Sequence, residues 1–345
     1  MLNLARNYFA ELADHIGTAW NRFWFTPSSP HTLCLVRVLA GALSVYYVAS
    51  FGPDVVQFFG PGGIVPVQTV REWTGGVVTR FSYFDYIQEP ASLHAAHYAG
   101  LAVVALFAVG FLTRVTSIAA LVVLVSYLHR APMLVSEAEP VLAMIVLYLC
   151  LGPAGACFSV DAWLRRRKLR AAGNDPAETG VPKSTAATIA TRLIQIHLAA
   201  IFVASGLAML SVQTWWAGDA VWWLVARPRS SGFWLARPLS RMPLVFMALT
   251  HFIVAYHFLL PLLVWNRLAR PLVLAAGLVI WPIVAVASGL YLYAAVMLAG
   301  TCIYLPPAFV ALLERRRTAA PDAEKDEIAA THKPSTSAQR ATVRV

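Results

Sequence analysis

The side chains most able to take part in chemistry are polar groups that interrupt long apolar stretches. His251 and His257 lie in the stretch Met242–Trp265, and His197 lies in Leu193–Val212. An ionisable group in a membrane span is a functional hypothesis by default, because placing it in lipid is costly. Either His251 or His257 could accept a proton; the alternative is a hydrogen-bonded structural histidine. The two are six residues apart, so they do not share a helical face and do not form a helical metal pair.

A second set of residues follows one stripe of the predicted helix Leu193–Val212. Its members recur at spacings that place them on one face: Arg192, Gln195, Phe202, Gly206 and Met209. The small residue at Gly206 would let another helix, or a flat ligand, approach closely. His197 points to a different face of the same helix. We therefore treat this stripe as a candidate binding surface, with helix packing as the alternative.

Arg37 lies about a turn and a half inside the first apolar stretch, Thr32–Phe51. A guanidinium there could pair with a carboxylate or a lipid headgroup. Alternatively, its long side chain could extend to the membrane interface, where the charge meets water.

Two polar segments between apolar stretches are rich in aromatic residues. One covers residues 52–92, and the other, residues 213–241, begins with Trp215 and Trp216. Such residues are typical of the aromatic belt at a membrane interface. The alternative is a lid over a lipophilic pocket near the outer leaflet.

The composition indicates which elements must position these groups. Of the 345 residues, 59% are hydrophobic and 13% are charged, and the mean hydropathy is +0.63. A soluble domain of this length carries roughly a quarter charged residues. The composition therefore predicts an all-α, polytopic membrane bundle.

The apolar stretches predict about eight transmembrane helices. Four stretches fit one crossing each: Thr32–Phe51, Pro140–Phe158, Leu193–Val212 and Met242–Trp265. Two others, Leu93–Leu128 and Pro271–Ala311, are too long for one crossing of a core of about 30 Å. We predict that the first breaks at Gly110 and the second at Ser288–Gly289.

Basic residues predict the direction of insertion. They gather near the start, at Arg114, in 161–192, in 266–270 and in the tail, as expected of cytoplasmic segments. We therefore predict a multi-pass protein of the cell (inner) membrane with both termini in the cytoplasm. The segment 213–241 fits less well, since it contains Arg227, Arg229, Arg237 and Arg241. The basic residues cluster beside apolar stretches, and this placement argues against nucleic-acid binding as the reason for the net charge of +10.

The chain divides into three parts. The pattern of residues 1–30 predicts an amphipathic helix at the membrane surface, because apolar residues recur there at spacings of three and four. Residues 31–313 form the transmembrane domain. Residues 314–345 are rich in Ala, Thr, Ser and charge, and we expect them to be disordered. The four cysteines lie in or beside apolar stretches without metal-binding spacing, so we predict no metal site.

Several segments in order resemble the HTTM family, the transmembrane domain shared with vitamin K-dependent γ-glutamyl carboxylase. The segments that carry the resemblance are Trp20–Phe25 (WNRFWF), Leu35–Gly41 (LVRVLAG), Phe58–Pro66 (FFGPGGIVP), Gly110–Thr116 (GFLTRVT), Leu151–Asp161 (LGPAGACFSVD) and Arg192–Ala220. The similarity covers roughly residues 15–312. It implies that residues 31–313 form an HTTM-like bundle with a reactive centre near the outer face.

The resemblance also implies which chemistry is missing. In the carboxylase, a lysine at the end of the fifth-span motif deprotonates vitamin K hydroquinone. The matching positions here are Ala208, Met209 and Leu210, and a thioether cannot take up that proton. Where the family often has a histidine in the seventh span, this chain has Trp281.

These features predict a non-carboxylating relative that binds a lipid or quinone, or that assists an exported peptide. The main alternative is a membrane enzyme that acts on an isoprenoid quinone or a peptide, with His251 or His257 as the base. A transporter is the second alternative, although no internal repeat is visible. The expected partners are the lipid bilayer and a small exported peptide; the expected cofactor, if any, is a quinone or another lipid.

Overall fold

The computed structural model describes residues 2–75, 80–174, 180–227, 234 and 241–314. Within this part the regular structure is helical, and the only β-type pairing is an isolated bridge between Ser28 and Ser184. The all-α prediction is therefore confirmed for the described residues. The predicted disordered tail covers residues 314–345. Glu314 is the last residue of a helix, and residues 315–345 lie outside the described part, as do Arg229 and Arg237.

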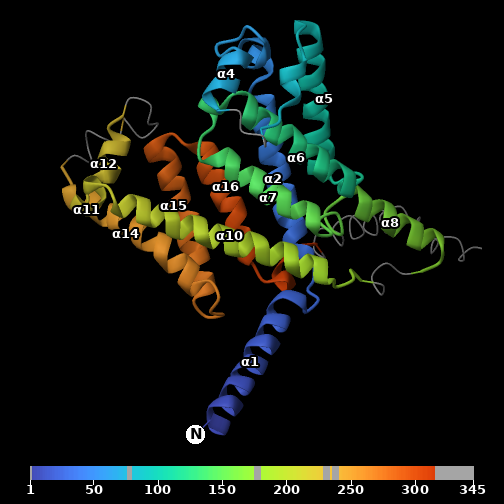
Figure 1. The fold of residues 1–345 in the computed structure, drawn as a ribbon, viewed down its shortest axis with the longest axis vertical. Helices are drawn as coiled ribbons and strands as arrows, with labels where there is room; N and C mark the ends of the chain where they lie inside the picture. Colours follow the sequence, from blue (N-terminus) through green and yellow to red (C-terminus); the bar gives the residue numbers. More distant parts are fainter. Residues whose placement is uncertain (1, 76–79, 175–179, 228–233, 235–240, 315–345) are drawn as a thin grey trace, which may run out of the picture.

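Eight helices form the body of the molecule (Figure 1). They are α2 (His31–Ala49), α5 (Pro90–Val109), α6 (Thr113–Arg130), α7 (Ala138–Leu151), α10 (Thr185–Leu210), α14 (Pro243–Leu263), α15 (Arg270–Ser288) and α16 (Tyr291–Thr301). Other helices connect or flank them: α1 (Leu2–Phe25), α3 (Val55–Phe59), α4 (Val67–Trp73), α8 (Val160–Ala171), α11 (Gln213–Ala217), α12 (Ala220–Val225) and a last described helix, Pro307–Glu314. Four single 3-10 turns lie at Gly52–Asp54, Tyr83–Tyr86, Pro132–Leu134 and Cys302–Tyr304 (η4).

Five of these helical segments are long and apolar enough to cross a membrane. A sixth is added if Tyr291–Tyr304 and Pro307–Glu314, which are bent by 104°, count as one span. Helix α7 has 14 residues, about 21 Å of helix, which is shorter than a bilayer core of about 30 Å. The chain is therefore consistent with an integral membrane protein, while the count of eight crossings stays a prediction.

Both predicted helix breaks occur at glycines in the left-handed conformation. Gly110 ends α5 with a φ of 75°, and Gly289 ends α15 with a φ of 76°. Glycine favours this conformation because it has no Cβ, and it is the common residue just after a helix. The two long apolar stretches therefore turn back where the sequence predicts.

Substitution of Gly110 by alanine is expected to disrupt the bundle. A Cβ at this position would lie 2.2 Å from Nη1 of Arg37 and 2.5 Å from Cβ of Ser159. The left-handed backbone alone costs roughly 1–2 kcal/mol for a residue with a Cβ. Gly173 is a matched control, because its φ is +77° and nothing lies within 4 Å of its ideal Cβ. Thermal unfolding in detergent should show a larger loss for Gly110→Ala than for Gly173→Ala; equal losses would contradict this packing.

The helices pack as two groups that share α16. Helix α2 contacts α5, α7 and α16, and α6 packs between α5 and α7. In the second group α10 contacts α14, α14 contacts α15, and α15 contacts α16. The contact between α7 and α10 closes the two groups into one bundle.

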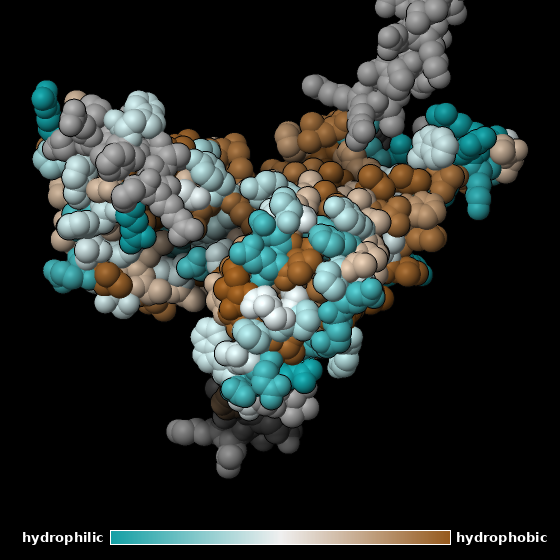
Figure 2. Space-filling view, turned by 90° about the horizontal axis from the view of Figure 1, so that it is seen from above, coloured by the Kyte–Doolittle hydropathy of each residue, from teal (hydrophilic) through white to brown (hydrophobic). Residues whose placement is uncertain are grey.

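The outer faces of the bundle are apolar. Many large hydrophobic side chains are exposed on α10, α14 and α15, among them Leu207, Leu244, Leu262, Leu272 and Leu278. Figure 2 shows brown hydrophobic side chains along the flanks of the molecule, and teal hydrophilic ones more frequent on the end that faces the viewer. An exposed apolar surface of this extent is expected when lipid is the solvent.

The segments predicted to lie on one side of the membrane meet at one end of the bundle. Ser28 pairs with Ser184, the Asp161 carboxylate accepts hydrogen bonds from Leu112 and Thr113, and Arg192 lies over Trp265. We call this the basic end, formed by residues 19–32, 110–114, 156–174, 180–192, 264–270 and 302–314. These segments therefore lie at one end of the described part, and the direction in which the chain crosses the membrane stays a prediction.

Residues 2–25 form one helix, α1, which extends away from the body of the molecule (Figure 1). Its exposed apolar residues include Phe9, Ile16 and Trp20. Only its last turns pack on the bundle, against α10. A helix is therefore present within the predicted range of residues 1–30. Its amphipathic role and its placement on the membrane surface stay predictions.

Candidate functional site

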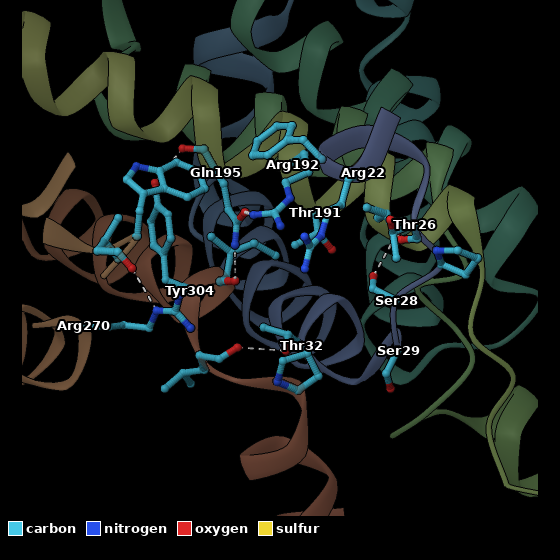
Figure 3. Close-up of a pocket in the computed structure, with 18 of the residues that line it drawn as sticks. Arg22, Thr26, Ser28, Ser29, Thr32, Thr191, Arg192, Gln195, Arg270 and Tyr304 are labelled. Atoms are coloured by element: carbon cyan, nitrogen blue, oxygen red, sulfur yellow. Dashed lines mark hydrogen bonds between the residues drawn. The ribbon is translucent and has the colours of Figure 1, made fainter. Parts of the chain in front are cut away.

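A cavity of about 560 Å³ opens at the basic end (Figure 3). It lies where the last turns of α1, the first half of α10, the α14–α15 junction and the segment after α16 come together. Three arginines line it, Arg22 from α1, Arg192 from α10 and Arg270 from α15. Its described lining residues include no Asp or Glu, so these three positive charges have no carboxylate partner within the cavity.

Arg192 is held in place by contacts on two sides. Its Nη1 donates to Oε1 of Gln195 over 2.9 Å. Its guanidinium carbon lies 4.4 Å from the centre of the Phe23 ring and 5.8 Å from that of Trp265. Aromatic faces attract a cation without neutralising it. The Arg192 charge is therefore positioned but remains available to an anion.

Gln195 connects Arg192 to the segment after α16. Its Nε2 donates to the carbonyl of Ile303 over 3.1 Å, and its backbone carbonyl accepts a hydrogen bond of 2.6 Å from the Tyr304 hydroxyl. Gln195 is buried. The structure thus brings two predicted binding residues, Arg192 and Gln195, to one cavity and fixes their side chains.

Arg270 supplies the opposite wall. Its Nε donates to the carbonyl of Val264 over 2.8 Å, and no hydrogen bond within the described part engages its two terminal nitrogens. Arg192 and Arg270 are close enough to repel each other. Two like charges held together in a half-buried cavity are unfavourable unless an anion lies between them. The remaining polar groups of the wall are hydroxyls, from Thr26, Ser28, Ser29, Thr32, Thr188, Thr191 and Tyr304.

Arg37 does not face this cavity. It is fully buried in α2, where Nη1 donates to the carbonyls of Phe107 and Ala108 over 3.0 Å each, and Nη2 donates to that of Phe158 over 2.5 Å. The first two carbonyls belong to the last turn of α5, whose backbone acceptors have no partner within the helix. Arg37 therefore joins α2, α5 and the loop before α8. Its hydrogen-bond partners are backbone carbonyls, in place of the predicted carboxylate or lipid headgroup.

Asp161 fixes the α5–α6 turn beside Arg37. Its carboxylate accepts hydrogen bonds from the backbone N–H of Leu112 and from the N–H and hydroxyl of Thr113, over 2.6–2.8 Å. Burial acts to raise the pKa of this carboxyl, but the Thr113 and Leu112 hydrogen bonds and the Arg37 charge together hold the pKa below its ordinary value.

This lowered pKa predicts an acid-sensitive turn. The folded pKa of Asp161 is below the unfolded value of about 3.9. Its contribution to stability is therefore present above that value and is lost as the pH falls through the folded pKa. We expect wild-type unfolding in detergent to depend on pH below about 4 more steeply than that of Asp161→Asn. Asp54→Asn, at an exposed position, should leave the pH dependence of unfolding as in the wild type. If Asp54→Asn reduces this pH dependence as much as Asp161→Asn does, the assignment to Asp161 is wrong.

His257 lies in a buried aromatic cluster between α10, α14 and α15. Its ring is 5.4 Å from that of Phe202 and 6.1 Å from that of Trp281. Nδ1 is hydrogen-bonded to the carbonyl of Ile253 over 2.8 Å. Its Nε2, the Tyr256 hydroxyl and the Trp281 indole nitrogen are buried without a hydrogen-bond partner among the described residues. Buried polar atoms of this kind are rare, and each calls for a reason.

Gly206 lies beside this cluster and provides the space for it. A Cβ on Gly206 would come within 2.9 Å of the Phe258 ring and 3.2 Å of Cβ of His257. This close approach of α10 and α14 agrees with the packing role expected of a small residue.

The other predicted site residues do not gather with His257. His251 is exposed, with Nδ1 bonded to the carbonyl of Met247 over 2.8 Å, and His197 is exposed with Nδ1 3.0 Å from the Tyr148 hydroxyl. Met209 and Trp215 are partly buried against the apolar core. Trp216 is exposed, and its indole N–H donates to the carbonyl of Leu210. These residues do not form one centre.

Several residues of the cavity were not predicted from the sequence. Arg22 and Arg270 lie in segments recognised as basic, but nothing in their spacing links them to Arg192. Trp265 and Tyr304 reach the cavity only because α14 and the segment after α16 end beside α10. The available signal was the pair of arginines without a carboxylate in residues 266–270.

The chain matches no protein-family profile, no curated protein sequence and no solved structure. The candidate site therefore rests on its own geometry.

Proposed function

We propose that this integral membrane protein binds an anionic lipid, with the headgroup in the cavity at the basic end. The observation that carries the proposal is the set of Arg22, Arg192 and Arg270 around one cavity, without a carboxylate among the described lining residues. Arginine is suited to phosphate and carboxylate groups, because its planar fork donates two parallel hydrogen bonds. The proposal includes a distant relationship to the HTTM family, which rests on the order of the sequence motifs described above.

The surroundings of the cavity fit an amphipathic ligand better than a free anion. Phe23 and Trp265 form part of its wall, and aromatic residues favour the level of the lipid headgroups. Leu268 beside the cavity is 85% exposed, and Leu262 and Leu272 are also exposed. An acyl chain could lie on these side chains while its headgroup contacts the arginines. In this arrangement the basic end faces the cytoplasm of the cell (inner) membrane, as the loop charges predict.

Thermal unfolding in detergent tests this function. A ligand that binds only the folded state raises its stability by RT ln(1 + [L]/Kd), about 2.7 kcal/mol at a hundredfold excess over Kd. Phosphatidylglycerol should raise the unfolding temperature, and phosphatidylcholine with the same acyl chains should not. Equal shifts with both lipids would show that only the acyl chains bind and would contradict a headgroup site.

A second candidate function is binding or conversion of an isoprenoid quinone at the buried cluster. The observation that favours it is the convergence of unpartnered polar atoms on Tyr256, His257 and Trp281. A quinone carbonyl can accept hydrogen bonds from a hydroxyl, an imidazole and an indole, and its flat ring suits the aromatic walls.

Removal of the Tyr256 hydroxyl tests the quinone candidate. In Tyr256→Phe, a short-chain quinone should bind roughly tenfold more weakly, because one hydrogen bond of about 1.4 kcal/mol is lost. The affinity is measured by the quenching of tryptophan fluorescence. The folded protein should lose little stability, because this hydroxyl lies near the Trp281 indole but makes no hydrogen bond of good geometry among the described residues. Tyr46→Phe, at an exposed position, is the control. Unchanged quenching in Tyr256→Phe would count against a quinone at this cluster.

A further inference from the structure

Three side chains of the types that bind zinc converge at the basic end, outside the arginine cavity. They are His31 at the start of α2, Cys157 in the loop between α7 and α8, and Glu314 at the end of the last helix. His31 Nε2, Cys157 Sγ and a Glu314 carboxylate oxygen all lie within 4.8 Å of one another. Ligand atoms around one tetrahedral zinc ion, at bond lengths of about 2.0–2.3 Å, are roughly 3.3–3.8 Å apart. The three atoms are therefore within a small side-chain adjustment of a shared ion.

The imidazole is already oriented for such a role. Nδ1 of His31 is 2.5 Å from the Ser29 hydroxyl, while Nε2 faces Glu314 at 3.1 Å. Histidine ligands of metals are commonly fixed in this way, by a hydrogen bond from the ring nitrogen that does not touch the metal. The Ser29 contact thus holds the ring with its ligand nitrogen toward the other two groups.

The remaining ligands are buried and supported. Cys157 is fully buried and Glu314 is nearly so. Arg166 forms an ion pair with Oε1 of Glu314, and His31 faces Oε2. The backbone N–H of Cys157 donates to Sγ of Cys34 over 3.2 Å, which fixes the loop that carries Cys157. An ion pair among Arg166, Glu314 and His31 accounts for the carboxylate and the imidazole, and the Cys157 thiol also contacts the Cys34 thiol. The observation that points to a metal is the convergence of all three ligand types on one place.

We propose that His31, Cys157 and Glu314 bind a divalent zinc-like cation that fastens the last helix to α2 and to the loop before α8. The combination of thiolate, imidazole and carboxylate suits zinc, which takes sulfur, nitrogen and oxygen ligands in tetrahedral sites. The Cys157 thiol loses its proton to solvent on binding, so the thiolate and the carboxylate together balance the charge of the ion. The fourth position is left to a water molecule.

Cobalt(II) titration of the full-length protein in detergent tests the proposal, after removal of metals with a chelator. The wild type should bind one cobalt ion per chain, with the near-ultraviolet absorption of a thiolate–cobalt bond. Cys157→Ser should lose this absorption, and Cys150→Ser should keep it, because Sγ of Cys150 is bonded to its own helix at the Val146 carbonyl. Zinc should displace the cobalt.

A second variant keeps the test decisive if Cys157→Ser fails to fold. Ser29→Ala leaves all three ligands in place and should lower the cobalt affinity about 10- to 100-fold, as expected when an outer hydrogen bond to a histidine ligand is lost. The proposal is overturned if the wild type shows no thiolate–cobalt absorption, or if Cys157→Ser shows the same absorption as the wild type.

Discussion

Replacement of Arg37 by alanine is expected to destabilise the protein by about 2–6 kcal/mol, because two buried backbone carbonyls lose their only donor. Arg37 is fully buried, and its guanidinium donates to three backbone carbonyls, two at the end of α5 and one before α8. Alanine would leave the carbonyls of Ala108 and Phe158 without a donor, while that of Phe107 keeps its hydrogen bond from the Gly110 N–H. Each buried unsatisfied group costs about 1–3 kcal/mol. We expect the loss to appear in denaturant unfolding in detergent.

Two further variants separate the charge of Arg37 from its shape. Lysine keeps the charge but cannot reach several carbonyls with a planar fork, so Arg37→Lys should fall between the wild type and alanine. Arg114 is exposed at the neighbouring turn, and Arg114→Ala should change stability by no more than about 0.5 kcal/mol. If Arg37→Ala and Arg114→Ala behave alike, the role assigned to Arg37 is wrong.

Neutralising the arginine cavity is expected to weaken binding of an anionic lipid about 100-fold. Arg192 and Arg270 face each other across the cavity, and neither has a carboxylate partner among its described lining residues. A hydrogen bond to a charged group contributes about 1.5–3 kcal/mol. At the lower end of this range, loss of one arginine should cost about tenfold in affinity and loss of both about 100-fold. Binding of phosphatidylglycerol to Arg192→Gln/Arg270→Gln, measured in detergent, gives this ratio.

The matched control removes the same amount of charge from the same end of the protein. Lys168 and Arg170 are exposed on α8, and they do not line the cavity. Lys168→Gln/Arg170→Gln should weaken binding only through the long-range field, which salt screens beyond about 10 Å at 0.1 M. If both double variants lose affinity equally at that salt concentration, net charge and not the cavity attracts the lipid.

The local features of this fold were predictable from the sequence. The breaks at Gly110 and Gly289 follow from the length of the apolar stretches and from the freedom of glycine to adopt a positive φ. Arg192 and Gln195 were expected on one face because they are three residues apart on one helix, and they do share a hydrogen bond.

The convergence of distant segments was not predictable. Arg22, Arg192 and Arg270 meet because the end of α1 and the start of α15 lie beside the first half of α10. This arrangement depends on helix packing and leaves no periodic signal in the sequence. The partners of Arg37 are backbone carbonyls, and a carbonyl has no signature in the sequence. His31, Cys157 and Glu314 are each more than 120 positions apart, so the spacing rules that identify local metal motifs do not detect them. His257 was identified from the sequence as a polar residue in an apolar span. Only the packing of the helices shows that the rings of Tyr256 and Trp281 lie beside it.

The central claim is that the cavity at the basic end holds an anionic headgroup, and native mass spectrometry of the protein released from mixed micelles tests it most directly. Micelles with equal amounts of phosphatidylglycerol and phosphatidylcholine of the same acyl chains would let the two lipids compete. We predict that the wild type retains phosphatidylglycerol in preference to phosphatidylcholine, and that Arg192→Gln/Arg270→Gln loses the preference. Retention of both lipids in equal proportion by the wild type, or an unchanged preference in the double variant, would contradict the account.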